Sequence, residues 1–509
     1  MQGSAAPLIS IIQDRSKCAA LLVIMLPVLL VTIDNTILNF AMPRIAAALN
    51  PSAAEQLWMI DAYSLVLAGL LVSMGSSGDR FGHRRMLCLG CMGFAVVSVG
   101  VVFSQHAWHL IAGRVLLGCF GAMILPATLA LIRTAFEERE ERRLAVAVWA
   151  TCLTIGSALG PLLGGVLLQY FSWQSVFLIA LPFLLPVLLF ASTITESPRQ
   201  LARSIDYLSI LLSLGAMTGV MLGLKHLATV GFDRQVLIWV LSGILLGIVF
   251  VRRQLKLEHP LLDLRLFVSS TFSVSVATNL VSLGLLVGFI FFATQLLQLV
   301  FGLSPLLAAL ILVPGQVLAI VAGFAIVPLA QKHAPNRVIS GCLLLAAAAF
   351  AMMALVEPTA LVVGVAFVML NASIAAITTV SNDLVLASVP AESVGSASSV
   401  SETAYEIGVV LGTTLIGGAV AALYRLSLVI PAGTPENIVT AVGTLGGAHA
   451  VSESLSEGVV MRIQEQANIA FIEGVMTTSI IVTGLIVLFA LVTYCYLRER
   501  SSADPVESR

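Results

Sequence analysis

Long apolar runs, separated by short polar breaks, divide most of this chain. Fourteen runs contain at least 16 mostly apolar residues each. A helix of about 20 such residues crosses a hydrocarbon core of about 30 Å. Because loops and open strands would leave unpaired backbone groups in lipid, each run is predicted to be a transmembrane helix. The runs lie near residues 18–42, 56–76, 86–104, 108–132, 144–168, 175–194, 205–226, 235–251, 271–293, 305–328, 339–356, 361–388, 397–424 and 471–497.

The composition also indicates an all-α integral membrane protein. Hydrophobic residues make up 59% of the chain and charged residues 10%, whereas soluble domains contain about 25% charged residues. The net charge of −1 gives no reason to expect a nucleic-acid partner. The seven cysteines lie in or beside apolar runs, so no metal site is expected.

The distribution of basic residues predicts the orientation in the membrane. An even number of spans places both termini on one side. Most arginines and lysines fall in the connections on that side, and cytoplasmic connections carry such an excess. Both termini are therefore predicted to be cytoplasmic. The basic residues assigned to the opposite side are Arg44, Lys225, Arg234, Arg425 and Arg462.

Two connections are longer than the others. The stretch 252–269 is basic and then amphipathic, and we expect it to lie along the cytoplasmic face. The stretch 425–470 is too polar to cross the bilayer and ends in a helix-favouring sequence. We expect an ordered extracellular cap there. It either gates an outer vestibule or is a tolerated surface insertion.

Two charged residues interrupt the apolar runs at similar depth. Asp34 lies in the outer part of the first run and Arg114 in the outer half of the fourth. A charge inside a bilayer costs at least about 2.5–3.5 kcal/mol unless it is paired or wetted. One interpretation is a static ion pair that holds two helices together. The other is a proton-coupling pair that breaks when Asp34 is protonated, because an adjacent cation and burial shift a carboxyl pKa in opposite directions.

A second pair of acids lies in the run 397–424. Glu402 and Glu406 are four residues apart and therefore share one helix face. Two carboxylates on one apolar face titrate as a coupled pair, and an arriving organic cation could displace the proton. The alternative is structural, with one acid facing polar backbone and the other capping a cavity.

Asp61 lies close to two aromatic residues, Trp58 and Tyr63. An acid beside aromatic rings can bind an organic cation, since each cation–π contact contributes about 0.5–2 kcal/mol. The alternative is a set of interface aromatics with a capping acid near the membrane surface. Tyr405 and Trp149 are weaker substrate-binding candidates, because such residues more often only pack.

The connection after the second run has an unusual frame. It places Gly75, Asp79, Arg80, Gly82 and Arg84 in a Gly-x-x-x-Asp-Arg-x-Gly pattern with further arginines. Glycines permit a tight turn and close helix contact, and the charged residues can join neighbouring helix ends. This pattern resembles the loop signature of the major facilitator superfamily.

Other stretches are similar to one branch of that superfamily, the fourteen-helix drug:proton antiporters of the QacA and SmvA type. They are LVTIDNTILNFAMP from Leu30 to Pro43 and the Arg114 stretch LIAGRVLLGCFGA. A third stretch matches the glycine-proline antiporter motif and contains Gly156, Gly160, Pro161, Gly164 and Gly165. Small residues there allow close helix approach. The resemblance extends over nearly the whole chain.

The resemblance has three departures. His83 stands where the loop signature has an arginine, which weakens the expected charge lock. The corresponding stretch of the second half, VPLAQKHAPNR, lacks the Asp-Arg frame. The run 305–328 contains no acid, although some relatives have a substrate-binding aspartate there, so the resemblance does not imply handling of divalent cations.

The resemblance implies the major facilitator fold, with two six-helix bundles and an inserted helix pair. We expect an N-terminal bundle over 1–200, helices seven and eight over 201–257, and a C-terminal bundle over 258–509. The implied function is export of lipophilic cationic drugs and biocides, including quaternary ammonium compounds, across the bacterial cytoplasmic membrane. The proton gradient would drive export without a cofactor, in a monomer embedded in the lipid bilayer.

Two other functions remain open at this point. One is a proton-coupled nutrient or metabolite transporter with the same fold, which would recognise neutral or anionic cargo through Arg, Lys, Asn or Gln side chains. The other is a membrane-embedded enzyme, which would need a His/Asp pair at the interface. The sequence shows no convincing pair of this kind and no phosphate-binding Gly-x-x-x-x-Gly-Lys-[Ser/Thr] motif.

Overall fold

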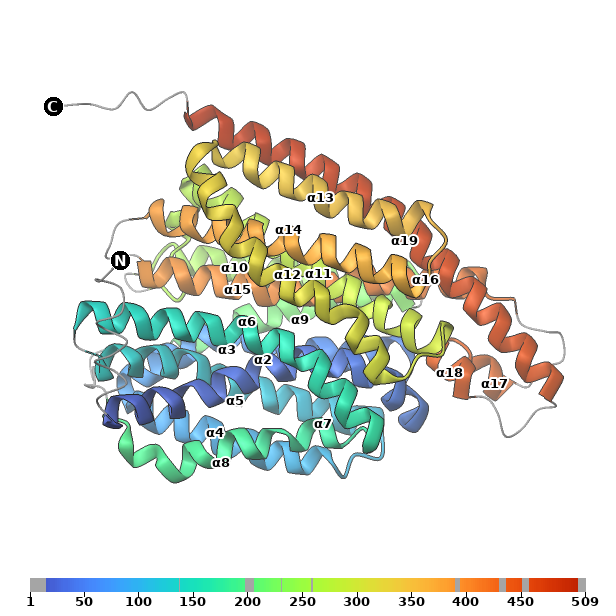
Figure 1. The fold of residues 1–509 in the computed structure, drawn as a ribbon, viewed down its shortest axis with the longest axis horizontal. Coiled ribbons are helices and arrows are strands. Elements are labelled where there is room, and N and C mark those ends of the chain that lie inside the picture. Colours follow the sequence, from blue (N-terminus) through green and yellow to red (C-terminus); the bar gives the residue numbers. More distant parts are fainter. Residues whose placement is uncertain are drawn as a thin grey trace.

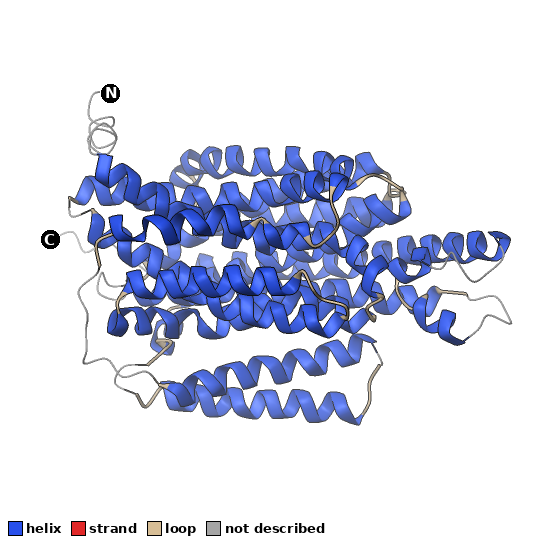
Figure 2. Cartoon of the chain, turned by 90° about the horizontal axis from the view of Figure 1, so that it is seen from below, coloured by secondary structure: helices blue, strands red, loops and turns tan. Residues whose placement is uncertain are grey.

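A computed structural model describes residues 15–136, 138–196, 206–229, 231–257, 260–389, 394–429, 436–450 and 457–501. All regular structure in these ranges is helical. Figure 1 shows most of the long helices side by side in one bundle, and Figure 2 shows the same bundle from a second side.

The predicted all-α fold with fourteen membrane spans is confirmed within the described residues. Fourteen helical segments there are long and apolar enough to cross a membrane. The principal helices are α2 (Arg15–Leu49), α3 (Ala53–Phe81), α4 (His83–Val101), α5 (Ala107–Ala135), α6 (Arg139–Tyr170), α8 (Ala180–Phe190), α9 (Tyr207–Thr229), α10 (Arg234–Gln254), α11 (Ser270–Gln295), α12 (Pro305–Lys332), α13 (Pro335–Leu355), α14 (Ala360–Ala387), α15 (Val394–Gly412), α16 (Gly418–Ser427) and α19 (Glu457–Ser501).

Three spans differ in detail from a single regular helix. The sixth is divided into α7 (Ser175–Leu178), α8 and the 3-10 turn η1 (Ala191–Thr193), with Pro186 inside α8. α11 continues into the π-helical turn η3 (Leu296–Val300), and α15 continues through a second π-helical turn, η5 (Thr413–Gly417), into α16. Such π-turns frequently mark functional positions in helices.

The last helix begins before its apolar run. α19 starts at Glu457, whereas the apolar run starts near 471. The polar first turns favour helix without being apolar enough to count as a span. The long outer connection therefore contains the start of α19 together with two short helices, α17 (Glu436–Ala441) and α18 (Leu445–Ala450).

The two ends of the bundle differ. α2 begins and α19 ends at one end, which we call the terminal end, whereas α17 and α18 lie at the opposite, far end (Figure 1). This arrangement is the one expected for fourteen spans with both termini on one side. That the terminal end faces the cytoplasm stays a prediction.

The inserted pair α9 and α10 packs together, and α9 also contacts α3 and α16. Near the terminal end, Arg253 donates to Asp206 through Nε and Nη2 at 3.1 and 3.0 Å. Partial burial of Asp206 opposes the effect, but hydrogen bonds from Arg253 and Ser209 hold the pKa of this carboxyl below its ordinary value. The division of the chain at 200 and 257 stays a prediction.

The glycine-rich stretch of α6 faces α2, the helix that carries Asp34. A side chain at Gly156 would collide with Thr32 and approach the Leu29 carbonyl to 2.9 Å. Gly160 meets Thr36 in the same way, one turn along. Gly164 lies against Ile37, so the motif lets the two helices approach closely.

Gly165 faces another neighbour, the first turn of α12. A Cβ atom there would lie 2.9 Å from Ala309 Cβ and 3.0 Å from Leu306 Cα. One motif thus brings α6 close both to a helix of the first half and to a helix of the second.

The connection between α3 and α4 adopts the tight turn that its glycines predict. Gly82 has a φ of +101°, and a Cβ atom there would lie 2.9 Å from the Glu196 carboxylate. Arg84 donates its backbone N–H to Glu196 at 2.9 Å and its Nη1 to the Ile194 carbonyl at 3.1 Å. The turn therefore joins the start of α4 to the segment that follows η1.

His83 compensates in part for the arginine that the loop signature has at this position and this chain lacks. Its Nε2 lies 3.1 Å from Asp79 Oδ1, which is four residues earlier in the last turn of α3. The imidazole thus supplies a partner for the motif aspartate within the same turn, a contact that the sequence comparison alone does not reveal.

Candidate functional site

The predicted partners Asp34 and Arg114 form a buried ion pair. Arg114 Nη1 donates to Asp34 Oδ2 at 2.6 Å, and the two side chains are 1% and 6% exposed. Arg114 Nε donates to the Met59 carbonyl at 3.1 Å. The guanidinium carbon lies 4.4 Å from the centre of the Tyr63 ring. The pair therefore joins α2, α3 and α5.

This pair can act as a chemical switch. Breaking a buried ion pair by removing one charge costs about 3–5 kcal/mol, because the other charge stays buried and uncompensated. Protonation of Asp34 removes one charge and releases Arg114 for another acceptor. The geometry alone is compatible with both a static pair and a switch.

Glu406 of α15 is a nearby acid to which Arg114 could turn when Asp34 is protonated. Its carboxylate lies near Ser64, Glu402 and Arg114. Its Oε2 is buried and accepts no hydrogen bond from any described residue. Tyr63 lies close enough to Asp34, Glu406 and Arg114 to interact with their charges. We call Asp34, Arg114, Tyr63 and Glu406 the central charge cluster.

The central charge cluster spans both halves of the chain. Ser64 on α3 donates to Asn35 Oδ1 on α2 at 3.3 Å. Asn35 follows Asp34 in the chain, so this hydrogen bond places the neighbour of Asp34 close to Ser64 and to Glu406. An acid of α15 is therefore close to the ion pair of α2 and α5. The sequence predicts each member separately, and the fold brings them together.

The other predicted acid, Glu402, lies one turn from Glu406 and is half-buried. Among the described residues no ion pair involves its carboxylate. Next to it, Tyr405 donates to Asn382 Oδ1 at 3.0 Å, and the same oxygen accepts from Asn279 Nδ2 at 3.0 Å. Tyr405 thus belongs to a polar network between α11, α14 and α15.

Trp149 has a local partner as well. Its Nε1 donates to Thr128 Oγ1 at 3.1 Å, which links α6 to α5. Its ring packs half-buried in the first half of the chain. The proposed roles of Trp149 and Tyr405 in substrate binding stay predictions.

Asp61 forms an ion pair with Lys225, a residue that the distribution of basic residues places on the outer side. Lys225 Nζ lies 2.7 Å from Asp61 Oδ2 and 4.1 Å from the centre of the Trp58 ring. Lys225 and Asp61 are 2% and 0% exposed. An acid–aromatic pair does surround a cation here, and that cation is the chain's own lysine. Binding of substrate by Asp61 and Trp58 stays a prediction.

All five basic residues assigned to the outer side lie within helices rather than in connections, Lys225 and Arg425 among them. Lys225 lies inside α9, and Arg425 lies in the last turn of α16, where its guanidinium donates to the Ala228 carbonyl. Both lie within three residues of the end of a span, where a hydropathy pattern cannot separate helix from connection. The sequence signal for this ion pair is a lysine inside an apolar helix, because such a charge needs a buried partner such as an acid.

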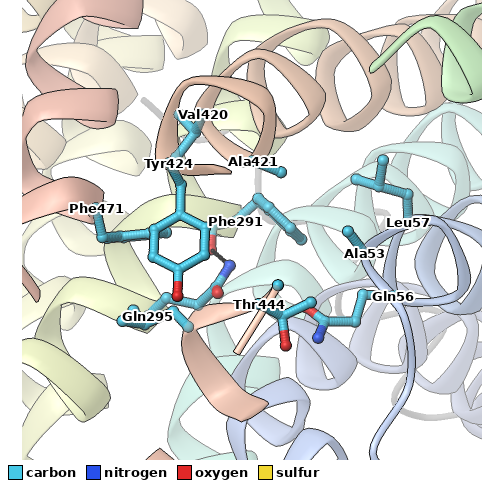
Figure 3. Close-up of a pocket in the computed structure, with 12 residues that line it drawn as sticks. Ala53, Gln56, Leu57, Phe291, Gln295, Val420, Ala421, Tyr424, Thr444 and Phe471 are labelled. Carbon is cyan, nitrogen blue, oxygen red and sulfur yellow. Dashed lines mark hydrogen bonds between the residues drawn. The ribbon is translucent and has the colours of Figure 1, made fainter. Parts of the chain in front are cut away.

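The far end of the bundle is closed by side chains from both halves. Gln298 Nε2 donates to the Phe40 carbonyl at 3.2 Å, and Gly446 of α18 packs against Ala46. Figure 3 shows Tyr424, Phe291, Phe471, Gln295 and Gln56 around a cavity of about 20 Å³. Tyr424 donates to the Val442 carbonyl at 2.8 Å, which ties α16 to the segment after α17. That the outer connection 425–470 gates this end stays a prediction.

Comparison with known proteins gives concordant results. The family model described as Major Facilitator Superfamily matches residues 24–413. The chain is 45% identical over 477 residues to the multidrug efflux pump LfrA of Mycolicibacterium smegmatis, covering 93% of this chain and 95% of LfrA. It is 35% identical to the methyl viologen resistance protein SmvA of Salmonella typhimurium, covering 89% and 92% of the two chains.

A solved structure with a similar fold is a bacterial homologue of the human lysosomal transporter Spinster, in an inward-facing and unoccupied conformation. Its TM-score is 0.68, with 17% identity, and the match covers 96% of this chain and 98% of that one. At this identity the likeness concerns the fold alone. The family match and the relatives identify a transporter rather than an enzyme. The chain belongs to the Major Facilitator Superfamily.

Proposed function

We propose that this protein is a proton-coupled antiporter that exports lipophilic cationic drugs and biocides, quaternary ammonium compounds among them. Its relatives LfrA and SmvA are named for multidrug efflux and methyl viologen resistance. The observation that carries the proposal is the central charge cluster. There a half-buried acid of the second half, Glu406, lies near the Asp34–Arg114 pair of the first half.

The first step concerns Asp34. While Asp34 is charged, Arg114 is held on α2. When a proton arrives from the outer side, Asp34 becomes neutral. Arg114 can then turn towards Glu406, with whose charge it already interacts. Arg114 then favours the charged form of Glu406, because an adjacent cation stabilises a carboxylate. The proton on one half thereby controls the charge on the other.

The second step concerns the cargo. Glu402 and Glu406 share one helix face, so protons and a cationic cargo compete for the same carboxylates. A lipophilic cation from the cytoplasm or the inner leaflet displaces a proton there. Release to the outside follows when protons return. Because protons and cargo exchange at Glu402 and Glu406, proton entry is coupled to cargo export without a cofactor.

Alternating access would use the contacts already described. The far end is closed by the contacts between Gln298 and Phe40 and between α18 and α2. Rocking of the two halves about a central site is the usual solution in such transporters. The glycine contacts of α6 and the turn at Gly82 are where we place the moving surfaces. The protein would act as a monomer in the bacterial cytoplasmic membrane, with both termini inside.

Export of ethidium tests the proposal in everted membrane vesicles. We expect uptake into these vesicles to follow an imposed proton gradient and to collapse to the level of vesicles without the protein when an uncoupler is added. Removing ATP while the gradient is maintained by respiration should have no effect. Gradient-independent uptake that requires ATP would contradict the proposal. So would a strong preference for neutral or anionic nutrients, which the alternative of a nutrient transporter predicts.

A further inference from the structure

The site around Asp61 has the chemistry of a cation-binding site. The carboxylate accepts from Thr414 Oγ1 at 3.0 Å and lies 2.7 Å from Lys225 Nζ. The face of the Trp58 ring covers the same ammonium at 4.1 Å. A carboxylate together with an aromatic face is how proteins recognise organic cations. In this structure the ligand position is occupied by a side chain from the inserted helix pair.

Three separate parts of the chain meet at this site. Asp61 and Trp58 come from α3, Lys225 from α9, and Thr414 from the π-turn η5. Two further contacts hold α9 to the helix after η5. Arg425 donates to the Ala228 carbonyl, and a Cβ atom on Gly418 would lie 2.9 Å from Ala228 Cβ. α9 therefore bridges the first and second halves toward the far end.

Opening the far end must disturb this junction. α3 belongs to the first half, whereas η5 continues the helix that carries Glu402 and Glu406. If the halves separate here, the hydrogen bond from Thr414 to Asp61 breaks, and Asp61 gains access to the outer side. In the scheme that follows, α9 moves with the second half, to which the Arg425–Ala228 hydrogen bond and its contacts with α16 join it, and Lys225 leaves Asp61. Asp61 and Trp58 would be left as an open cation site.

We propose that Lys225 is a tethered counter-cation that clears cargo from Asp61. With the far end open, the positive group of a lipophilic cation on its way out lies on Asp61 and the Trp58 ring. As the far end closes, the ammonium of Lys225 replaces it and the cargo leaves. A cation that arrives from outside then finds the site occupied, which favours export over re-entry. This inference rests on the proposed function and assigns a role to α9.

Cation binding to the purified protein tests this role, with tetraphenylphosphonium as the probe. We expect one bound cation per chain in the original protein and a second in Lys225→Met, which keeps an unbranched side chain only one atom shorter and removes its charge. The second cation should be absent from the double variant Asp61→Asn/Lys225→Met. Lys256→Met is the matched control, because this lysine is exposed at the end of α10, and it should bind one cation.

The outcomes separate this inference from the proposed function. If the original protein binds one cation but folded Lys225→Met also binds only one with unchanged affinity, the role of Lys225 is refuted and the export function stands. If the original protein binds no cation and transports none, the proposed function itself fails.

Because Lys225→Met leaves a buried acid unpaired, a second measurement uses the unmodified protein. The chain contains four lysines, and the other three, Lys17, Lys256 and Lys332, lie in connections predicted to be cytoplasmic. An impermeant amine-reactive reagent added outside should therefore modify Lys225 alone. We expect acylation of Lys225, detected by mass spectrometry, to rise at least about tenfold during ethidium export. Equal acylation with and without cargo under turnover would overturn the inference.

Discussion

Replacing Asp34 by asparagine is expected to abolish uphill cation export. The variant cannot lose and regain a proton at this position, and Arg114 remains buried without its carboxylate at 2.6 Å. We expect proton-driven ethidium uptake into everted vesicles to fall at least about 100-fold. Equilibrium binding of ethidium to the purified variant should stay within a few-fold, because the helix face with Glu402 and Glu406 is unchanged.

The controls separate coupling from folding. An unpaired buried charge can cost about 3–5 kcal/mol of stability, so Asp34→Asn is compared with Asp34→Asn/Arg114→Gln, in which no charge is left alone. The double variant should be more stable than the single one and equally inactive. Asp34→Glu, which keeps a titratable group, should retain measurable transport. Full uphill transport by Asp34→Asn would remove this residue from the coupling mechanism.

Replacing Gly156 by alanine is expected to have the second-largest effect. The new methyl group would collide with Thr32 and approach the Leu29 carbonyl to 2.9 Å. Overpacking of this kind costs about 1–3 kcal/mol and would move α2, with Asp34, away from α6. We expect the melting temperature to fall by several degrees and ethidium transport to fall at least about tenfold. Scanning fluorimetry and vesicle uptake measure the two changes.

Gly341→Ala is the matched control, because apart from the adjacent backbone of α13 no heavy atom lies within 4 Å of a Cβ atom at that position. Alanine favours helix over glycine by about 1 kcal/mol, so this variant should be as stable as the original protein or slightly more stable. If Gly156→Ala behaves like Gly341→Ala, the close contact between α2 and α6 has no functional importance.

The sequence predicts most of the fold because lipid imposes a simple rule. A backbone in hydrocarbon must satisfy its own hydrogen bonds, so each apolar run of sufficient length becomes a helix. The pairing of Asp34 with Arg114 is also predictable, since two opposite charges at one depth in an apolar bundle are costly unless they meet. α19 begins before the apolar run because its first turns are polar, as the helix-favouring sequence at the end of 425–470 predicts.

The surroundings of the site depend on which helices are neighbours, and a hydropathy pattern contains no such information. Asp61 near Trp58 predicts a cation, but only the packing of α9 against α3 shows that Lys225 provides it. The proximity of Glu406 to Arg114 likewise follows from the contact between α15 and α3. The two halves meet through tertiary packing that leaves no local trace in the sequence.

The claim that cationic cargo and protons compete for buried carboxylates has one direct test. Tetraphenylphosphonium is added to the purified protein in weakly buffered solution, and proton release is recorded with a pH indicator. We expect release of about one proton per bound cation near neutral pH, and a clear reduction of this release in Glu406→Gln. Stoichiometric cation binding with no proton release at any pH between about 5 and 9 would contradict the account.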